Sequence, residues 1–203
     1  MVLPPAAQNK PRSREEKYQL KNTRSETAVL SAAFASLYAV GVVVLAPISY
    51  QIVQVRIADA LLPLSILFGW PAVLGLTFGA FVANLFGGLG PLDVLGGSLA
   101  NFIATYFAWR IARNRARDWI VIAIGLEIII VTLVVGTYLS YILAIPLQVG
   151  YVGVLLGSII AIGLLGSMIL YALSAERIAS ILRSHGILIY TWTENAEAVR
   201  SRI

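Results

Sequence analysis

The stretch QVRIADALLPLSILFGWPAVLGLTFGAFVANLFGGLGPLDVLGGSLAN, residues 54–101, decides how the whole chain is interpreted. It is strongly apolar, and Pro63 and a glycine-rich run at 87–90 interrupt it. A charge near the centre of a bilayer costs about 3 kcal/mol or more. Charged groups beside interrupted helices therefore indicate a polar cavity inside a membrane bundle. The polar side chains of this stretch are Arg56, Asp59, Asn84, Asp93 and Asn101.

The composition also indicates an integral membrane protein. Of the 203 residues, 59% are hydrophobic and only 12% are charged, whereas soluble domains average about 25% charged residues. The absence of cysteine excludes disulfides, and a single histidine, His185, excludes a histidine-based metal cluster or a catalytic triad. The net charge of +5 lies at the ends of apolar spans, so we expect no nucleic-acid partner.

Six membrane spans are expected, because a spanning helix needs about 20 apolar residues. The second is short and contains Pro63. We therefore predict an all-α bundle of six transmembrane helices in a membrane domain at 27–175, between a polar tail at 1–26 and a basic tail at 176–203. The spans are expected at 27–49, 57–69, 71–87, 91–110, 119–143 and 150–174.

Arginines in the short connections predict the orientation. Four of them lie at 110–117, between spans four and five, and two more follow span six at 177 and 183. The positive-inside rule places these segments, and both termini, in the cytoplasm of a multi-pass plasma-membrane protein. Residues 175–185 predict a basic amphipathic helix ended by Gly186. The residues after it lie either on the membrane surface, through Ile187, Ile189, Tyr190 and Trp192, or in a loosely ordered tail.

Several polar residues are candidates for ligand binding. Arg56 and Asp59 share one helix face at the outer end of span two, as a local salt bridge or as the wall of a site. Asp93 lies in the first turn of span four, where it either complements the helix dipole or contacts a ligand. Asp93, Gly97 and Asn101 recur every four residues and form a polar stripe. The side chain of Asn84 either forms an interhelical hydrogen bond or contacts a ligand.

Glu127 is the deepest candidate, about 12 Å into span five at 1.5 Å per residue. An acidic residue inside the membrane is a functional candidate. The alternative is an ion pair with an arginine of the 110–117 connection.

Two stripes of small residues allow close helix approach. One is Gly75, Gly79 and Ala83 on span three. The other, on span one, either packs within the chain or docks a partner helix; it consists of Ala28, Ala32, Ala35 and Ala39.

Sequence motifs for catalysis or nucleotide binding are absent. The chain contains no G-x-x-x-x-G-K-[ST], no G-x-S-x-G and no H-E-x-x-H. We expect a binding subunit that is not an enzyme and holds no cofactor of its own.

Three segments carry a resemblance to a known family: VQVRIADAL at 53–61, GLTFGAFVANLFGGLGPLDVLGGSLANFIA at 75–104 and, more weakly, VGVLLGSIIAIGLLGSMILYAL at 152–173. They resemble the QueT family of queuosine-precursor transporters, which are S components of energy-coupling-factor (ECF) transporters. The chain departs from the family at Asp59, where glutamate is usual, and at Ser158, where an acid often stands.

The resemblance implies a protein that captures a small molecule from outside and works with a transmembrane coupling subunit and two ATPases, which use the ATP. It implies that the alanine stripe of span one docks the coupling subunit. It also implies a 7-deazaguanine substrate, a queuosine or archaeosine precursor. Carboxylates, amides and an arginine could pair with such a base, and Phe86, Phe102 or Trp70 could stack on it.

Three other functions are compatible with the same residues. The same scaffold could bind another vitamin or nucleobase. Asp59, Asp93 and Glu127 could act as acid–base groups of a membrane enzyme. The polar side chains could also serve only to hold helices together.

Overall fold

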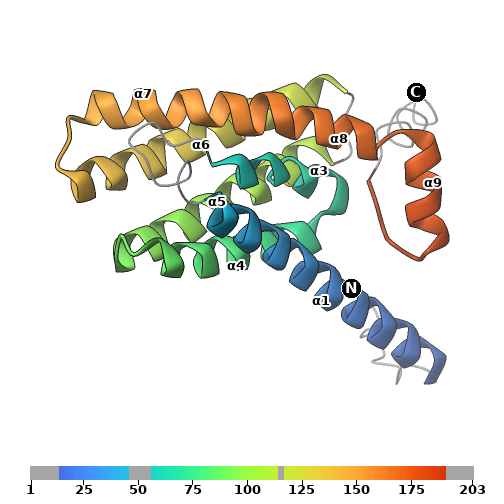
Figure 1. The fold of residues 1–203 in the computed structure, drawn as a ribbon. Helices are drawn as coiled ribbons and strands as arrows, with labels where there is room; N and C mark the ends of the chain where they lie inside the picture. Colours follow the sequence, from blue (N-terminus) through green and yellow to red (C-terminus); the bar gives the residue numbers. More distant parts are fainter. Residues whose placement is uncertain (1–13, 46–55, 114–116, 191–203) are drawn as a thin grey trace, which may run out of the picture.

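The computed structural model describes residues 14–45, 56–113 and 117–190, whose regular structure is entirely helical (Figure 1). Six passes form one bundle, which confirms the predicted fold class. They are followed by α9 (Glu176–Ser184). The passes are α1 (Arg14–Val44), η1 (Ile57–Leu61) with α3 (Leu64–Phe68), α4 (Trp70–Gly87), α5 (Pro91–Ala112), α6 (Asp118–Leu143), and α7 (Leu147–Ser158) continued by η2 (Ile159–Gly166) and α8 (Ser167–Leu173).

Four of these passes are long and apolar enough to cross a membrane: α1 from Ser25, α4, α6 and α7–α8. The other two are the short η1–α3 pass and α5, which contains Asp93 and Asn101. α1 begins at Arg14 and runs unbroken into the membrane segment, so its helix is longer than the span predicted from residue 27.

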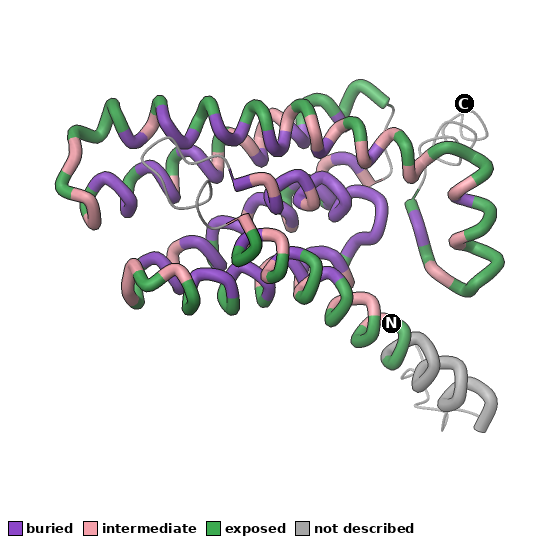
Figure 2. Tube along the Cα trace, in the orientation of Figure 1, coloured by how far each residue is buried: buried purple, intermediate pink, exposed green. Residues whose placement is uncertain are grey.

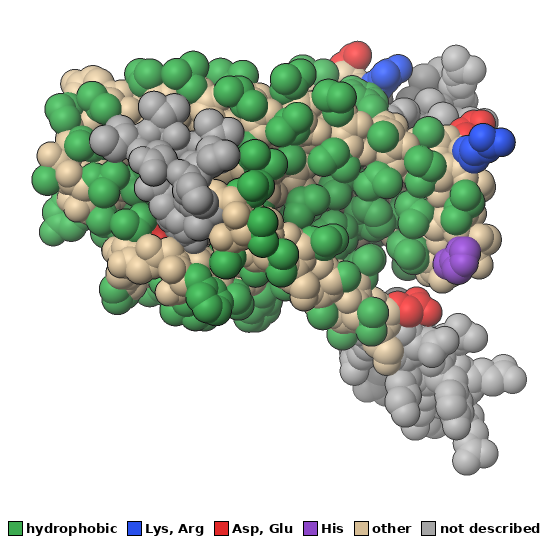
Figure 3. Space-filling model, in the orientation of Figure 1, with side chains coloured by type: hydrophobic (Ala, Val, Ile, Leu, Met, Phe, Trp, Pro, Cys, Tyr) green, Lys and Arg blue, Asp and Glu red, His purple; other side chains and the backbone are tan. Residues whose placement is uncertain are grey.

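The described ends of the chain lie at the same end of the bundle. α1 begins there and α9 lies there, whereas the α4–α5 and α6–α7 turns lie at the opposite end (Figure 1). An even number of passes produces this arrangement. In Figure 3 the middle of the visible face is mostly hydrophobic, and the coloured charges gather mainly near α9. The positive-inside rule makes this the cytoplasmic end.

The short second pass forms the centre of the bundle rather than an outer element. All five residues of α3 are buried (Figure 2). A helix enclosed on all sides must be apolar around its whole circumference, as Leu64, Ile66 and Leu67 illustrate. Pro63 separates η1 from α3. Gly69 ends α3 with φ of 63°, where a Cβ would lie 3.0 Å from Trp109 Nε1, so the chain turns there because the residue is glycine.

The glycine stripe of span three packs within the chain. A Cβ on Gly75 would overlap the carbonyl oxygen of Ser31, and one on Gly79 would lie 2.8 Å from that of Ala35. These two glycines therefore bring α4 against the backbone of α1.

The sixth pass contains an eight-residue π-helix, η2, which was not predicted. Its last residue, Gly166, packs on Pro63: a Cβ there would lie 2.8 Å from Pro63 Cγ and 3.0 Å from the carbonyl oxygen of Ala60. The wider helix thus faces the break in the second pass.

The amphipathic helix predicted at 175–185 is present as α9, and Gly186 follows with φ of 80°. The next residues fold back onto the bundle. Tyr190 donates its backbone N–H to the carbonyl of Leu67 at 2.8 Å, and Ile189 is buried. Ile189 therefore fits neither of the two alternatives given for this segment, because its side chain is buried with the core of the bundle. Trp192 lies outside the described residues.

Candidate functional site

A buried cluster of polar side chains lies at the outer end of the bundle. It is built from four elements, since Tyr38 comes from α1, Arg56 and Asp59 from the start of η1, Asp93 from α5 and Tyr138 from α6. Each of these side chains is at most 7% exposed. Groups separated by up to a hundred residues in sequence thus meet in one place.

Two tyrosine–aspartate pairs form the frame of this cluster. Tyr38 Oη donates to Asp59 Oδ1 at 2.5 Å, and Tyr138 Oη donates to Asp93 Oδ1 at 3.1 Å. Arg56 interacts electrostatically with both carboxylates and is the cation that they share. A buried carboxylate is tolerated only when donors and a counter-charge compensate its lost hydration. The local Arg56–Asp59 pair and the distant Asp93 therefore belong to one charged network.

Glycines let the tyrosine of α6 reach the acid of α5. A Cβ on Gly96 would lie 2.8 Å from the ring of Tyr138, and one on Gly97 would lie 3.2 Å from its hydroxyl and overlap the amide of Asn84. The polar stripe predicted on span four is therefore present, and its middle member is small because two polar side chains converge on it.

Asn84 and Asn101 both lie beside this cluster. Asn84 is fully buried and donates Nδ2 to the backbone carbonyl of Asp93 at 2.8 Å, so the predicted interhelical bond is present. Its Oδ1 has no partner among the described residues. Asn101 donates to the carbonyl of Leu76 at 3.4 Å and also interacts with the phenol of Tyr38. A hollow of about 440 Å³ at the α4–α5 turn is lined partly by Asn84, Gly88 and Gly90.

Glu127 lies deeper, between α6 and α3. It is fully buried and accepts a hydrogen bond from Ser65 Oγ at 3.4 Å, while Oε2 has no partner among the described residues. The alternative of an ion pair between Glu127 and an arginine of the 110–117 connection is not seen among the described residues: Oε1 accepts from Ser65, and Arg113 and Arg117 lie over Trp109 and Tyr171. Within the described part of the chain, no three His, Cys, Asp or Glu residues are grouped to hold a metal ion.

The sequence analysis did not identify two residues of the cluster, Tyr38 and Tyr138. The available signal was spacing, since Phe34, Tyr38 and Val42 follow one another every four residues on the buried face of α1. A phenol in such a stripe needs a partner for its hydroxyl group.

The aromatic residues proposed for stacking do not join the cluster. Phe86 is 74% exposed. Trp70 packs against Trp109 at 5.5 Å between ring centroids, and Phe102 stacks on Tyr106 at 5.9 Å. Trp70 starts α4 and Trp109 lies in the last turn of α5, so they lie at the cytoplasmic end, where aromatic residues typically mark the membrane interface.

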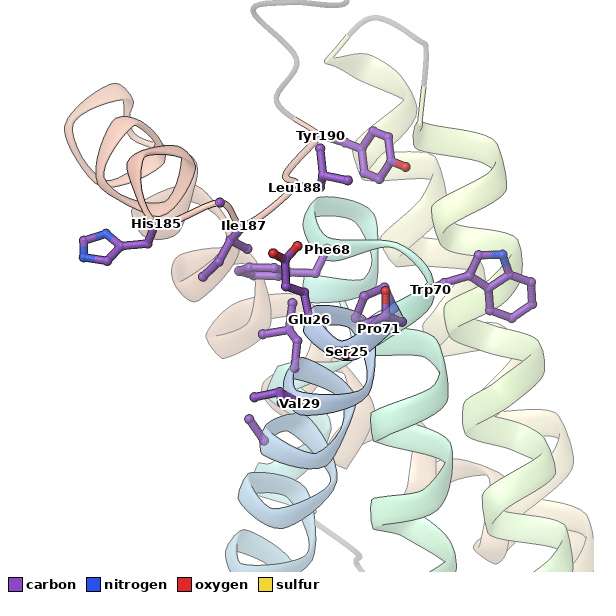
Figure 4. A pocket seen from close by; sticks show the side chains of 14 residues that line it. Ser25, Glu26, Val29, Phe68, Trp70, Pro71, His185, Ile187, Leu188 and Tyr190 are labelled. Carbon is purple, nitrogen blue, oxygen red and sulfur yellow. The ribbon is translucent and has the colours of Figure 1, made fainter. Parts of the chain in front are cut away.

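A second hollow, of about 510 Å³, lies at the cytoplasmic end. It is bounded by residues 25–33 of α1, the α3–α4 junction and the segment after α9, and Figure 4 shows Val29, Phe68 and Leu188 along it. Its walls are mainly apolar and lack the network of charged groups found at the outer end.

A helical bundle that crosses the membrane several times and encloses a charged cluster near one surface is typical of membrane proteins that bind a solute, among them the membrane transporters. Comparison with known proteins identifies the family within this class. The QueT transporter family matches residues 28–175, and the chain belongs to that family. It is a multi-pass protein of the plasma membrane and a transporter, not an enzyme. The searches of curated proteins and of solved structures each found no match.

Proposed function

We propose that this chain is the substrate-binding S component of an ECF-type importer and captures a 7-deazaguanine, a queuosine or archaeosine precursor, from outside the cell. The observation that carries the proposal is the buried network of Arg56, Asp59 and Asp93 at the outer end of a chain of the QueT transporter family. The guanine edge of such a base has adjacent N–H donors beside a carbonyl. A carboxylate accepts the donors, and an arginine or an amide serves the carbonyl.

The proposed substrate-binding residues are the six singled out in the sequence. The described geometry supports a direct role for Arg56, Asp59, Asn84, Asp93 and Asn101, which lie around one cluster. Glu127 is the inner member; it accepts a hydrogen bond from Ser65 and is near enough to Asp59 for an electrostatic interaction. We assign it to the floor of the site.

Replacement of Asp59 tests the proposal. The purified protein in detergent should bind a 7-deazaguanine, and Asp59→Asn should weaken binding about 10- to 100-fold, because it removes a charge-assisted hydrogen bond. Equilibrium binding and ligand-induced thermal shifts measure this effect. Asp118→Asn is the matched control, since Asp118 is an exposed carboxylate at the other end of the bundle.

A panel of thiamine, riboflavin, biotin and guanine in the same assay separates the alternatives. Stabilisation by a vitamin alone would assign the chain to a different substrate. If no compound changes the midpoint of unfolding, the polar groups only hold helices together.

The alanine stripe of α1 is the proposed contact with the coupling subunit. Ala28 and Ala32 are exposed, whereas Ala35 and Ala39 are half-buried, Ala35 because it packs on Gly79. The exposed half leaves a smooth face on which another helix can pack closely.

Ala32→Leu is expected to abolish co-purification with the coupling subunit and the ATPases while leaving substrate affinity unchanged within about twofold. The reason is that a larger side chain keeps the partner helix away without touching the outer cluster. Ala33→Leu is the matched control, because Ala33 is also exposed but lies about 100° further around the helix. Equal loss of the complex in both variants would contradict the assignment.

A further inference from the structure

The hollow at the cytoplasmic end is separate from the cluster at the outer end. It has a volume of about 510 Å³ and lies between residues 25–33 of α1, the α3–α4 junction and the segment 185–190 (Figure 4). Pockets that hold small ligands have volumes of about 300–1,000 Å³. No residue of the outer cluster lines this hollow, so the transport function proposed above does not account for it.

The lining of this hollow changes from polar to apolar along α1. The apolar membrane segment of α1 begins at Ser25, so Ser25, Glu26 and Thr27 lie at the membrane interface. Val29 and Ala33, which also line the hollow, lie about 6 and 12 Å further into the membrane, at 1.5 Å per residue. A phospholipid has the same order, with its head group at the interface and its acyl chains in the hydrocarbon core.

Large apolar side chains on two walls of the hollow are left uncovered by the protein. Val29 of α1 is 71% exposed, and Leu188 of the segment after α9 is 72% exposed. Phe68, from the end of α3, is buried beside them (Figure 4). Because Val29 belongs to the membrane segment of α1, the apolar part of the hollow opens towards acyl chains rather than towards water.

Glu26 gives the polar end of the hollow its charge. It is the only Asp, Glu, Lys or Arg among the residues that line the hollow. Its carboxylate lies between α1 and the segment after α9 (Figure 4), and a Cβ on Gly186 would lie 3.9 Å from Oε1. Within the described part of the chain, this carboxylate has no hydrogen-bond or ion-pair partner. It therefore attracts a cationic head group and repels an anionic one.

We propose that this hollow binds a phospholipid of the cytoplasmic leaflet whose head group carries a primary ammonium group. The ammonium group donates to the carboxylate of Glu26, and one acyl chain lies along Val29, Ala33 and Phe68. Both the charge and the N–H donors favour this head group over one whose only charge is its phosphate. The lipid joins the start of the first membrane span to the segment after α9, and so stabilises the cytoplasmic end of the bundle.

The test compares phosphatidylethanolamine and phosphatidylglycerol with identical acyl chains, each added in mixed micelles to the full chain in detergent. The shift of the unfolding midpoint with lipid concentration gives the apparent affinities. Wild type should bind phosphatidylethanolamine about three- to tenfold more tightly, because Glu26 attracts one head group and repels the other. Glu26→Gln should bring the ratio to within about twofold. Glu176→Gln should keep the wild-type ratio, since Glu176 is an exposed carboxylate of the same end that does not line the hollow.

A second variant tests the place of binding. In Ala33→Trp the indole fills the apolar part of the hollow, so the affinity for both lipids should fall about tenfold or more. Leu37→Trp is the control, because Leu37 is 60% exposed one turn further along α1 and does not line the hollow. The unfolding midpoint without added lipid checks that each variant folds.

Four results would overturn the proposal. These are no shift of the midpoint with either lipid, equal affinities in wild type, an unchanged ratio in Glu26→Gln, and unchanged lipid binding in Ala33→Trp. If Ala33→Trp keeps its lipid affinity but no longer co-purifies with a coupling subunit, the hollow belongs to a protein partner instead.

Discussion

Arg56→Met is expected to destabilise the protein by about 3–5 kcal/mol, the range for removing one partner of a buried charged network. Asp59 and Asp93 would then share the outer cluster with no cation from η1. Both are nearly inaccessible, at 7% and 1% exposed, so water cannot replace the guanidinium. The midpoint of thermal or denaturant unfolding in detergent measures the loss, and Arg110→Met, at an exposed arginine, should change it little.

The triple variant Arg56→Met, Asp59→Asn, Asp93→Asn separates charge imbalance from lost packing. Neutralising both carboxylates should recover most of the stability while binding stays absent, because two neutral amides require no counter-ion. If the triple variant is as unstable as Arg56→Met alone, the role of Arg56 is in packing its aliphatic stem rather than in compensating charge.

Gly79→Ala is the second large effect that we expect. The added methyl group would lie 2.8 Å from the carbonyl oxygen of Ala35 and 2.8 Å from Tyr38 Cβ. Neither is the movable end of a side chain, so α1 and α4 must separate, at a cost of about 1–3 kcal/mol or more. The displacement also moves Tyr38 relative to Asp59. Both the unfolding midpoint and ligand affinity should therefore fall.

Gly125→Ala is the matched control on α6. A Cβ at Gly125 has open space around it, so alanine should be neutral or stabilise the helix by up to about 1 kcal/mol. A Gly79→Ala protein with wild-type stability and affinity would show that the α1–α4 contact can relax without reaching the cluster.

The sequence predicted the bundle well because membrane spans carry a strong signal. Long apolar stretches ended by glycine or proline place α4 and α5 to within one or two residues. The central position of α3 could not be predicted in this way, since a short apolar segment that contains Pro63 is equally typical of a tilted span at the outside of the bundle. Its enclosure depends on contacts with α5 and α8, which are distant in sequence.

The sequence likewise predicted some residues of the candidate site and not others. Charged residues in apolar sequence are conspicuous, so Arg56, Asp59 and Asp93 were predicted as candidates. Their partners were not, because Tyr38 and Tyr138 resemble ordinary interfacial aromatic residues until the packing of α1 and α6 turns each hydroxyl towards a carboxylate. The stacking role proposed for Trp70 is wrong, because Trp70 begins α4 at the cytoplasmic end of the bundle and packs on Trp109 there, away from the cluster.

The π-helix of the sixth pass has a consequence for how the chain tolerates length changes. In η2 each turn holds more residues than an α-helix, so the segment stores extra chain. Deleting one residue from 159–166 would let this segment adopt ordinary α-helical geometry without breaking the pass. Because the deleted residue is the one that widens the helix, α7 and α8 would keep nearly the same relative orientation, and Gly166 would stay near Pro63. A one-residue deletion, which rotates the two halves of an ordinary α-helix by about 100°, would here leave both the span and its contact with the second pass intact.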